Sequence, residues 1–189
     1  LPQGHGTLPR GHSGRHHRVI QERHPESEEA MHSEMGRKDR ALSKEEALAV
    51  LEKAEYGFLG TVSPDNEPYV VPLSFTVGGD KVYFHCARTG EKLDNITKNP
   101  SVCFCVVGPT EPVYETGFST VYESCMVFGK AEEVTDETER REALLERARK
   151  NLPEYMDKAD DAIAKTGKAT AVYTISMDRV TGKAKRKKL

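Results

Sequence analysis

Apolar residues between positions 44 and 54 recur every three to four residues, which predicts an amphipathic helix. Ser43 and Glu46 have the spacing of a capping box and would begin that helix. From Tyr56 onward the apolar period falls to two, which is typical of strands with one buried face. The strands predicted from this pattern cover residues 56–62, 68–76, 81–86, 101–107, 121–134 and 169–175.

The segments between these strands carry helix signals. Thr89 is placed to cap a short helix that Pro100 ends. Pro153 separates two further helical segments, 136–151 and 154–165. Glu, Arg and Lys recur at i, i+4 spacings along the first of them, and we interpret it as a solvent-facing helix with modest ion pairs.

Three local features refine the strand pattern. Residues 108–120 are rich in Gly, Pro and Thr and are interpreted as a loop, and Gly129 marks a bend within the long strand. Pro72 cannot donate to a strand ladder, so its strand lies at an edge or bulges there. About six mostly antiparallel strands joined by short turns and helices predict an α+β fold, mainly β, built on a six-stranded antiparallel barrel.

The composition divides the 189 residues into three parts. Residues 1–34 hold six of the seven histidines and no apolar periodicity, so we expect a disordered polar extension. Residues 35–183 have the pattern of one globular domain. Residues 184–189 are predominantly basic and are expected to form a tail.

Several classes of protein are disfavoured by the same sequence. The net charge of −2 gives no overall electrostatic footprint for nucleic acid, and no apolar run approaches the roughly 20 residues that span a membrane. There is no glycine-rich nucleotide motif and no zinc-ligand spacing, so we expect no metal site. The beginning of the sequence lacks the apolar core of a signal peptide.

The four cysteines, Cys86, Cys103, Cys105 and Cys125, lie in apolar, strand-like stretches without a C-x-x-C pair. We expect reduced, buried thiols in a cytoplasmic protein. Cys103 and Cys105 would share one strand face, where adjacent positions do not usually meet disulfide geometry, so we expect both to pack in the core.

The strongest chemical signal lies where the strand ending near Cys86 gives way to the next helix. Arg88 and Lys92 flank the expected helix start at Thr89 and Gly90. Cations are unfavourable at a helix N-terminus, which already carries partial positive charge, unless an anion binds there. Amide donors, a hydroxyl group and two cations are the components of a phosphate site. A solvated turn with two surface cations is the alternative interpretation.

These pieces, in this order, resemble the FMN-binding split-barrel superfamily of pyridoxamine 5′-phosphate oxidase. The sequence is most similar to the 5-nitroimidazole-resistance (NimA-type) branch, and the resemblance covers residues 35–183. It rests on the segments 37–40, 57–61, 68–75, 83–92, 99–100, 127–131 and 180–183.

The resemblance implies a homodimer with two FMN sites at the subunit interface. It places one strand against the flavin ring, the next strand end and turn at the phosphate, and Ser124 on a strand from the partner. The cofactor-binding residues so implied are Val71, Pro72, Leu73, Ser74, Phe75, Phe84, His85, Ala87, Arg88, Thr89, Gly90, Lys92 and Ser124.

The functional expectation is an FMN-dependent oxidoreductase that passes electrons from a reduced nicotinamide to a small organic acceptor, such as a nitroaromatic compound. Val71 and Thr76 stand where the oxidase has Arg and Lys, and no catalytic residue is assigned; Ser74 and Tyr122 are the candidates for proton delivery. The alternatives are a flavin- or haem-binding module for storage or sensing, and a reductase that uses the deazaflavin F420.

Overall fold

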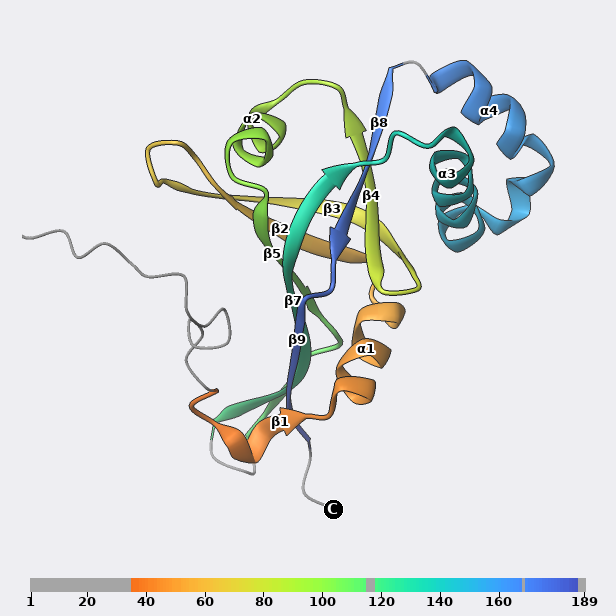
Figure 1. Ribbon diagram of the computed structural model, residues 1–189. Coiled ribbons are helices and arrows are strands. Elements are labelled where there is room, and N and C mark those ends of the chain that lie inside the picture. The colour runs from red at the N-terminus through yellow and green to blue at the C-terminus, as the bar shows by residue number, and fades with distance from the viewer. Residues whose placement is uncertain (1–34, 115–117, 168, 187–189) are drawn as a thin grey trace, which may run out of the picture. The chain divides into compact units, whose positions relative to one another are not determined.

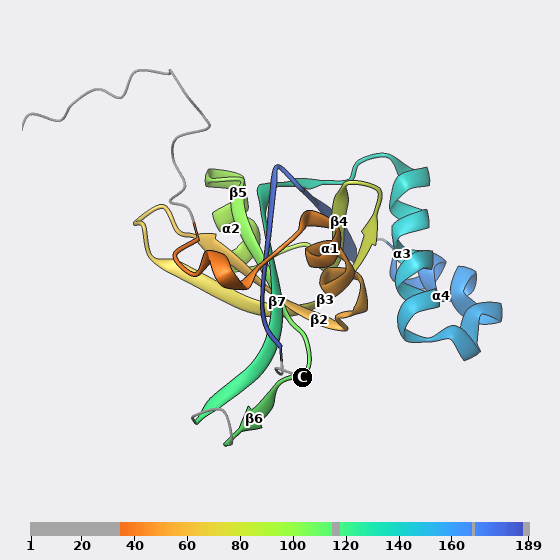
Figure 2. The same cartoon turned by 90° about the horizontal axis from the view of Figure 1, so that it is seen from below.

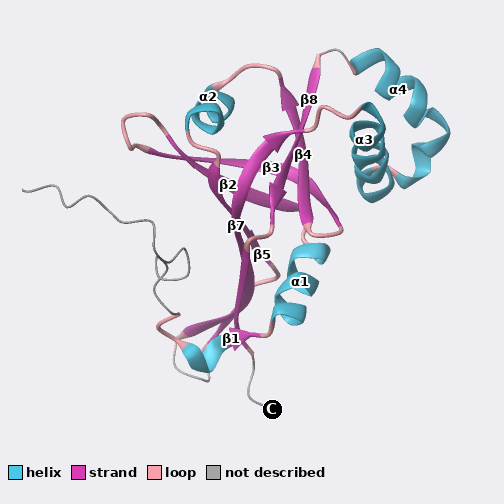
Figure 3. Cartoon of the chain, viewed as in Figure 1, coloured by secondary structure: helices cyan, strands magenta, loops and turns pink. Residues whose placement is uncertain are grey.

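The computed structural model describes residues 35–114, 118–167 and 169–186. The extension expected over 1–34 and the last three residues of the expected basic tail lie outside these ranges. Helices and strands are labelled in Figures 1 and 3. The helices are α1 (Lys44–Lys53), α2 (Glu91–Lys98), α3 (Glu137–Asn151) and α4 (Ala159–Thr166), with short 3-10 helices over Lys38–Arg40 and Pro153–Lys158. The strands are β1 (Ala41–Leu42), β2 (Tyr56–Val62), β3 (Pro68–Gly78), β4 (Lys81–Ala87), β5 (Ser101–Val107), β6 (Glu111–Val113), β7 (Ser119–Glu133), β8 (Thr170–Ser176) and β9 (Arg179–Lys185).

Six strands close into an antiparallel barrel, which confirms the predicted fold. Their order is β7-β5-β2-β3-β4-β8, and β8 returns to pair with the end of β7. Closure leaves a barrel no free edge around its circumference. Alternate residues point inward, and Leu59, Phe75 and Phe104 form the centre of the core, with the rings of Phe75 and Phe104 edge to face at 4.9 Å.

The long strand β7 serves two sheets, as the predicted bend at Gly129 requires. Up to Lys130 it pairs with β5, and from Ala131 it pairs with β8. A Cβ on Gly129 would lie 1.8 Å from the carbonyl oxygen of Ser176, so only glycine allows the two backbones to meet here. The other half of β7 extends away from the barrel beside β6 and β9 (Figure 2).

The sequence pattern missed three strands, the two-residue β1 and the strands β6 and β9. The expected loop over 108–120 contains β6 and the first residues of β7. The strand predicted over 169–175 is not the last strand of the chain. The strand β9 follows it and pairs with β7 and β1. This strand extends through Lys185, so the domain continues into the first two residues of the expected tail, and Ala184 is buried.

The core position expected for two cysteines was also wrong. Cys103 and Cys105 are half-buried on the outer face of β5, because the inward positions of this strand are Val102, Phe104 and Val106. The charged side predicted for α3 faces solvent and carries ion pairs, and the other face of the helix covers the barrel. Leu144 and Leu145 are buried there, and buried Arg140 donates to the carbonyl oxygens of Gly167 and Thr170.

Candidate functional site

The barrel is split where β3 and β4 diverge. Their ladder holds only the pairs from Phe75–Phe84 to Gly78–Lys81. Among the described residues, the earlier part of β3 pairs with β2 alone, and the later part of β4 pairs with β8 alone. The backbone edge of residues 70–74, which we call the open edge of β3, therefore carries no strand partner on this side. This confirms the edge position predicted from Pro72.

The side chains along the open edge alternate between the core and the outside. Val71 and Leu73 pack against the core cluster, while Pro72 is exposed and Ser74 is half-buried. Phe75 is fully committed to the core, and the ammonium group of Lys150 lies 4.2 Å from its ring centroid. Residues 71–74 can thus offer a ligand their backbone groups and the outward side chains, whereas the backbone of Phe75 pairs with Phe84.

The two β4 residues expected at the cofactor face opposite ways. Phe84 is buried and stacks on Tyr173 at 5.5 Å, so its side chain belongs to the core. His85 points outward beneath α3 and is half-buried. Burial lowers the pKa of His85 below its usual value of 6.5, and the positive charge of Arg147 lowers it further. The imidazole is therefore held neutral.

The depressed pKa of His85 gives stability a pH dependence. The unfolded chain takes up a proton near pH 6.5, whereas the folded protein takes it up only at lower pH. The contribution of His85 to stability is complete above about pH 6.5 and is lost as pH falls toward the folded pKa. We expect urea midpoints that rise with pH across this window, and a His85→Gln variant whose midpoints rise less. Equal slopes for the two proteins would contradict this assignment.

The start of α2 differs from the sequence expectation in one detail that matters for binding. Gly90, and not Thr89, is the N-cap residue; its φ is 136°, and no side chain caps the helix. A Cβ on Gly90 would meet nothing within 4 Å, so the space over this turn is open. The first amide donors of a helix have no intrahelical acceptors. An anion can approach them here, which fits a phosphate group.

The helix α2 is firmly held, so the turn before it is well positioned. Leu93 and Ile96 are buried in the core, and the Asn95 amide donates to the Thr61 hydroxyl at 3.1 Å. Lys92 in the first turn is half-buried. Burial raises the pKa of the Cys86 thiol, and the positive charge of Lys92 lowers it. The ammonium group of Lys92 is therefore near Cys86, at the end of β4.

The remaining cation of this group turns toward β7. Arg88 and Glu133 form an ion pair at 3.4 Å, and both side chains are about half exposed. Exposed pairs of this kind contribute little stability. Ala87 and Thr89, which flank Arg88, are exposed as well. The structure therefore brings Arg88, Thr89, Gly90 and Lys92 to one turn at the split end of the barrel.

Ser124 lies elsewhere in the chain. It is opposite Val107 on β5 and Lys183 on β9, and its hydroxyl donates to the Lys183 carbonyl oxygen at 3.5 Å. Within the part of the chain that the structure describes, no strand pairing joins this half of β7 to β3 or β4. Tyr122 is on the same half of β7. One chain alone does not bring Ser124 to the other candidate residues.

Sequence reasoning singled out Ser74 but missed Arg147, which also lies beside His85. A cavity of about 10 Å³, room for roughly one water molecule, lies between β3, β4 and α3. Ser74, Thr76, Tyr83 and Arg147 line it with His85. The Nε atom of Arg147 is buried without a hydrogen-bond partner among the described residues. Only the packing of α3 across the barrel brings Arg147 here, so no local sequence pattern could reveal it.

Comparison with known proteins agrees with this fold. Residues 43–184 match the family model described as pyridoxamine 5′-phosphate oxidase. A putative 5-nitroimidazole antibiotic resistance protein from Bacteroides thetaiotaomicron has 27% sequence identity and a TM-score of 0.67; the match covers 76% of this chain and 86% of that one. No curated protein matched the sequence.

Two more distant structures share the fold. The flavocytochrome Anf3 from Azotobacter vinelandii has 24% identity and a TM-score of 0.67, with 77% of this chain and 68% of that chain covered. An FAD and haem binding protein from Mycobacterium smegmatis has 18% identity and a TM-score of 0.64, with 77% and 72% covered.

The fold and its divergent strands define a split barrel of the flavin-binding type. The chain belongs to the pyridoxamine 5′-phosphate oxidase family, since the family model spans three quarters of it. Among the described residues, no helix has the length and apolar character needed to cross a membrane.

Proposed function

We propose that this protein is a flavoprotein oxidoreductase of the NimA-like group, which binds FMN and passes electrons from a reduced nicotinamide to a small organic acceptor. The observation that carries the proposal is the split between β3 and β4, which opens beside the uncapped start of α2 and its cations. Membership of the family supports a flavin, as does the naming of flavin- or FAD-binding proteins among the structural neighbours. The nitroimidazole-resistance neighbour supports a nitroaromatic acceptor.

The residues present have distinct roles in this proposal. The backbone of the open edge of β3 would form hydrogen bonds with the flat polar edge of the flavin ring. Pro72 has no backbone N–H, so it would donate no hydrogen bond there and would leave space for the ring. The amides after Gly90 and the ammonium group of Lys92 would hold the phosphate, with Arg88 turning to it from Glu133. When bound, the flavin supplies the capacity to accept and release electrons in pairs or singly.

The side chains that line the cavity beside His85 are the protein's own polar groups near the open edge of β3. His85 is neutral, so one ring nitrogen can donate and the other can accept. Ser74 lines the same cavity and belongs to the open edge of β3. We propose that Ser74 relays the proton that the reduced acceptor requires, taking a proton from solvent water through the cavity as its own hydroxyl proton leaves, with His85 and Arg147 beside it. Haem and F420 are the alternative cofactors, and a visible spectrum distinguishes each of them from FMN.

The outer face of the barrel supports a second copy of this chain as partner. Phe58, Cys105 and Met126 are direct cross-strand neighbours on β2, β5 and β7, and all three point away from the core. Phe58 is 46% and Met126 37% exposed, and Val107 on the same face is 48% exposed. Apolar patches of this kind mark interaction surfaces. We propose a twofold homodimer through this face, which would also bring Ser124 of one copy toward the other copy's site.

Replacing Phe58 by Glu tests this dimer. The side chain is outside the core, so the variant should fold, while a buried charge at the interface should prevent association. We expect the wild type to sediment as a dimer and the variant as a monomer with less bound flavin. Tyr155→Glu, at an exposed aromatic residue beyond this face, is the control and should remain dimeric. A wild-type monomer would contradict the proposed assembly.

A further inference from the structure

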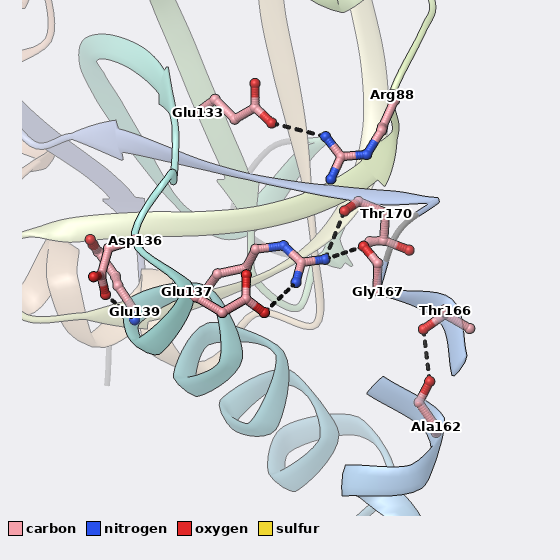
Figure 4. Close-up of polar contacts among 10 residues, drawn as sticks. Arg88, Glu133, Asp136, Glu137, Glu139, Ala162, Thr166, Gly167 and Thr170 are labelled. Carbon is pink, nitrogen blue, oxygen red and sulfur yellow. Dashed lines mark hydrogen bonds and ion pairs between the residues drawn. The ribbon is translucent and has the colours of Figure 1, made fainter. Parts of the chain in front are cut away.

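A second hollow lies between the strand ends and the helices α3 and α4, and apart from Arg88 its lining belongs neither to the resemblance nor to the proposed flavin site. It has a volume of about 640 Å³ and lies between the ends of β4 and β7 and the helices α3 and α4. We call it the α3–α4 cleft. Its size falls within the range of small-molecule sites, roughly 300–1,000 Å³. Figure 4 shows the polar groups around it, with Arg88 and Glu133 at the strand ends and Glu137 on α3.

One wall of the cleft is rigid. The guanidinium group of Arg140 is buried and donates to the carbonyl oxygens of Gly167 and Thr170, the latter at 2.9 Å, while it pairs with Glu137 at 3.1 Å. Ile163 packs with Val134 in a small core cluster below. A site built on such fixed groups keeps its shape without a ligand.

The other charged groups of the lining form partly exposed ion pairs, so their side chains can shift. Arg88 lines the cleft from the turn that also contains Thr89 and Gly90. Its pair with Glu133 is long and half exposed, and pairs of this kind contribute little stability. Arg141 on α3 pairs with Asp160 on α4 and is about half exposed. Arg88 thus connects the lining of the cleft with the turn that forms the proposed flavin phosphate site.

The lining combines three kinds of group in one hollow. Arginines suit a phosphate, carboxylates such as Glu137 can accept hydrogen bonds from ribose hydroxyls, and Ile163, Val134 and Ala164 provide an apolar surface for a flat base. A purely apolar ligand would leave the charges unmatched, and a polyanion would meet as many carboxylates as guanidinium groups. The combination fits a nucleoside monophosphate.

We propose that the α3–α4 cleft binds the adenosine 5′-phosphate half of a dinucleotide. This inference rests on the proposed function, because Arg88 links the cleft to the flavin phosphate. Two dinucleotides carry this half: FAD, which would extend from the flavin site into the cleft, and NADPH or NADH, the proposed electron donor. The cleft residues bind and orient the ligand and take no part in the chemistry.

The test fills the cleft and leaves the flavin site intact. Ala164 on α4 is exposed and lines the cleft, so Ala164→Trp should fill it without disturbing the core, and Ala162→Trp, on the same helix but outside the lining, is the matched control. We would measure dissociation constants of AMP, FMN and FAD by calorimetry, and the KM for NADPH. AMP should bind the wild type and the control, and bind Ala164→Trp at least tenfold more weakly, while FMN affinity stays within twofold.

The two sources of the adenylate give different results. If FAD is the source, FAD binds the wild type at least tenfold more tightly than FMN, and Ala164→Trp removes this difference. If the donor is the source, FAD and FMN bind equally and the variant raises the KM for NADPH at least tenfold. No AMP binding, with FAD affinity and NADPH KM unaltered in the variant, overturns the cleft assignment even where FMN binds normally. AMP binding without any flavin binding would support the cleft assignment and contradict the proposed flavin site.

Discussion

Replacing Lys92 by Glu is expected to weaken FMN binding by at least about 100-fold, which corresponds to about 2.7 kcal/mol of binding free energy. The change removes a charge-assisted hydrogen bond to the phosphate, worth about 1.5–3 kcal/mol, and adds repulsion at the open turn after Gly90. Lys92 is only half-buried in the first turn of α2, so folding should be preserved. Flavin fluorescence titration gives the dissociation constant directly.

Lys98→Glu is the matched control, because this lysine occupies the last turn of the same helix. It makes the same change in net charge at the end of α2 away from the site. We expect its FMN affinity to stay within about threefold of the wild type, a change of less than 1 kcal/mol. Equal losses in the two variants would mean that general charge, and not the turn at Gly90, governs binding.

Gly129→Ala is expected to destabilise the protein by about 3 kcal/mol, the upper end of the cost of overpacking. The added methyl group would overlap the Ser176 carbonyl oxygen, a backbone atom that cannot rotate away, at the point where β7 passes from β5 to β8. The neighbouring hydrogen bond from the Lys130 amide to the Ser176 hydroxyl would be disturbed as well. Urea unfolding at neutral pH measures the loss.

The control for this substitution is Gly60→Ala on β2. There an added Cβ would lie 3.4 Å from the nearest atom, the Cys103 carbonyl oxygen, and ordinary small shifts accommodate it. We expect a change of less than about 1 kcal/mol, as for most substitutions without a steric conflict. A Gly129→Ala variant as stable as Gly60→Ala would show that β7 and β8 do not approach as closely as the structure has them.

Much of the fold could be predicted because its signals are local. The period-two pattern located most strands, and the residue types at Gly129 and Pro72 were enough to indicate the bend and the open edge. The strand β9 escaped because Arg179, Lys183 and Lys185 alternate with small residues, which resembles a polar tail. Its place is fixed by tertiary contact, since a Cβ on Gly182 would lie 2.6 Å from the Cβ of Ala47 on α1.

Part of the candidate site could likewise be predicted from local signals, and part of it could not. Arg88, Gly90 and Lys92 are close in sequence, so the local chemistry of a helix start was enough to single them out. His85 and Arg147 line the same cavity because α3 packs across β4. No local sequence pattern indicates how this helix packs on the strand. The choice of Thr89 as N-cap failed because a glycine with φ of 136° ends the preceding extended segment one residue later.

The absorption spectrum of the purified protein, before and after addition of FMN and removal of the unbound fraction, tests the central claim most directly. We expect two flavin bands that remain with the protein, and a loss of these bands in Lys92→Glu but not in Lys98→Glu. A colourless protein that releases all added FMN, or a protein with a haem Soret band in place of the flavin bands, would contradict the proposal that the split between β3 and β4 holds a flavin.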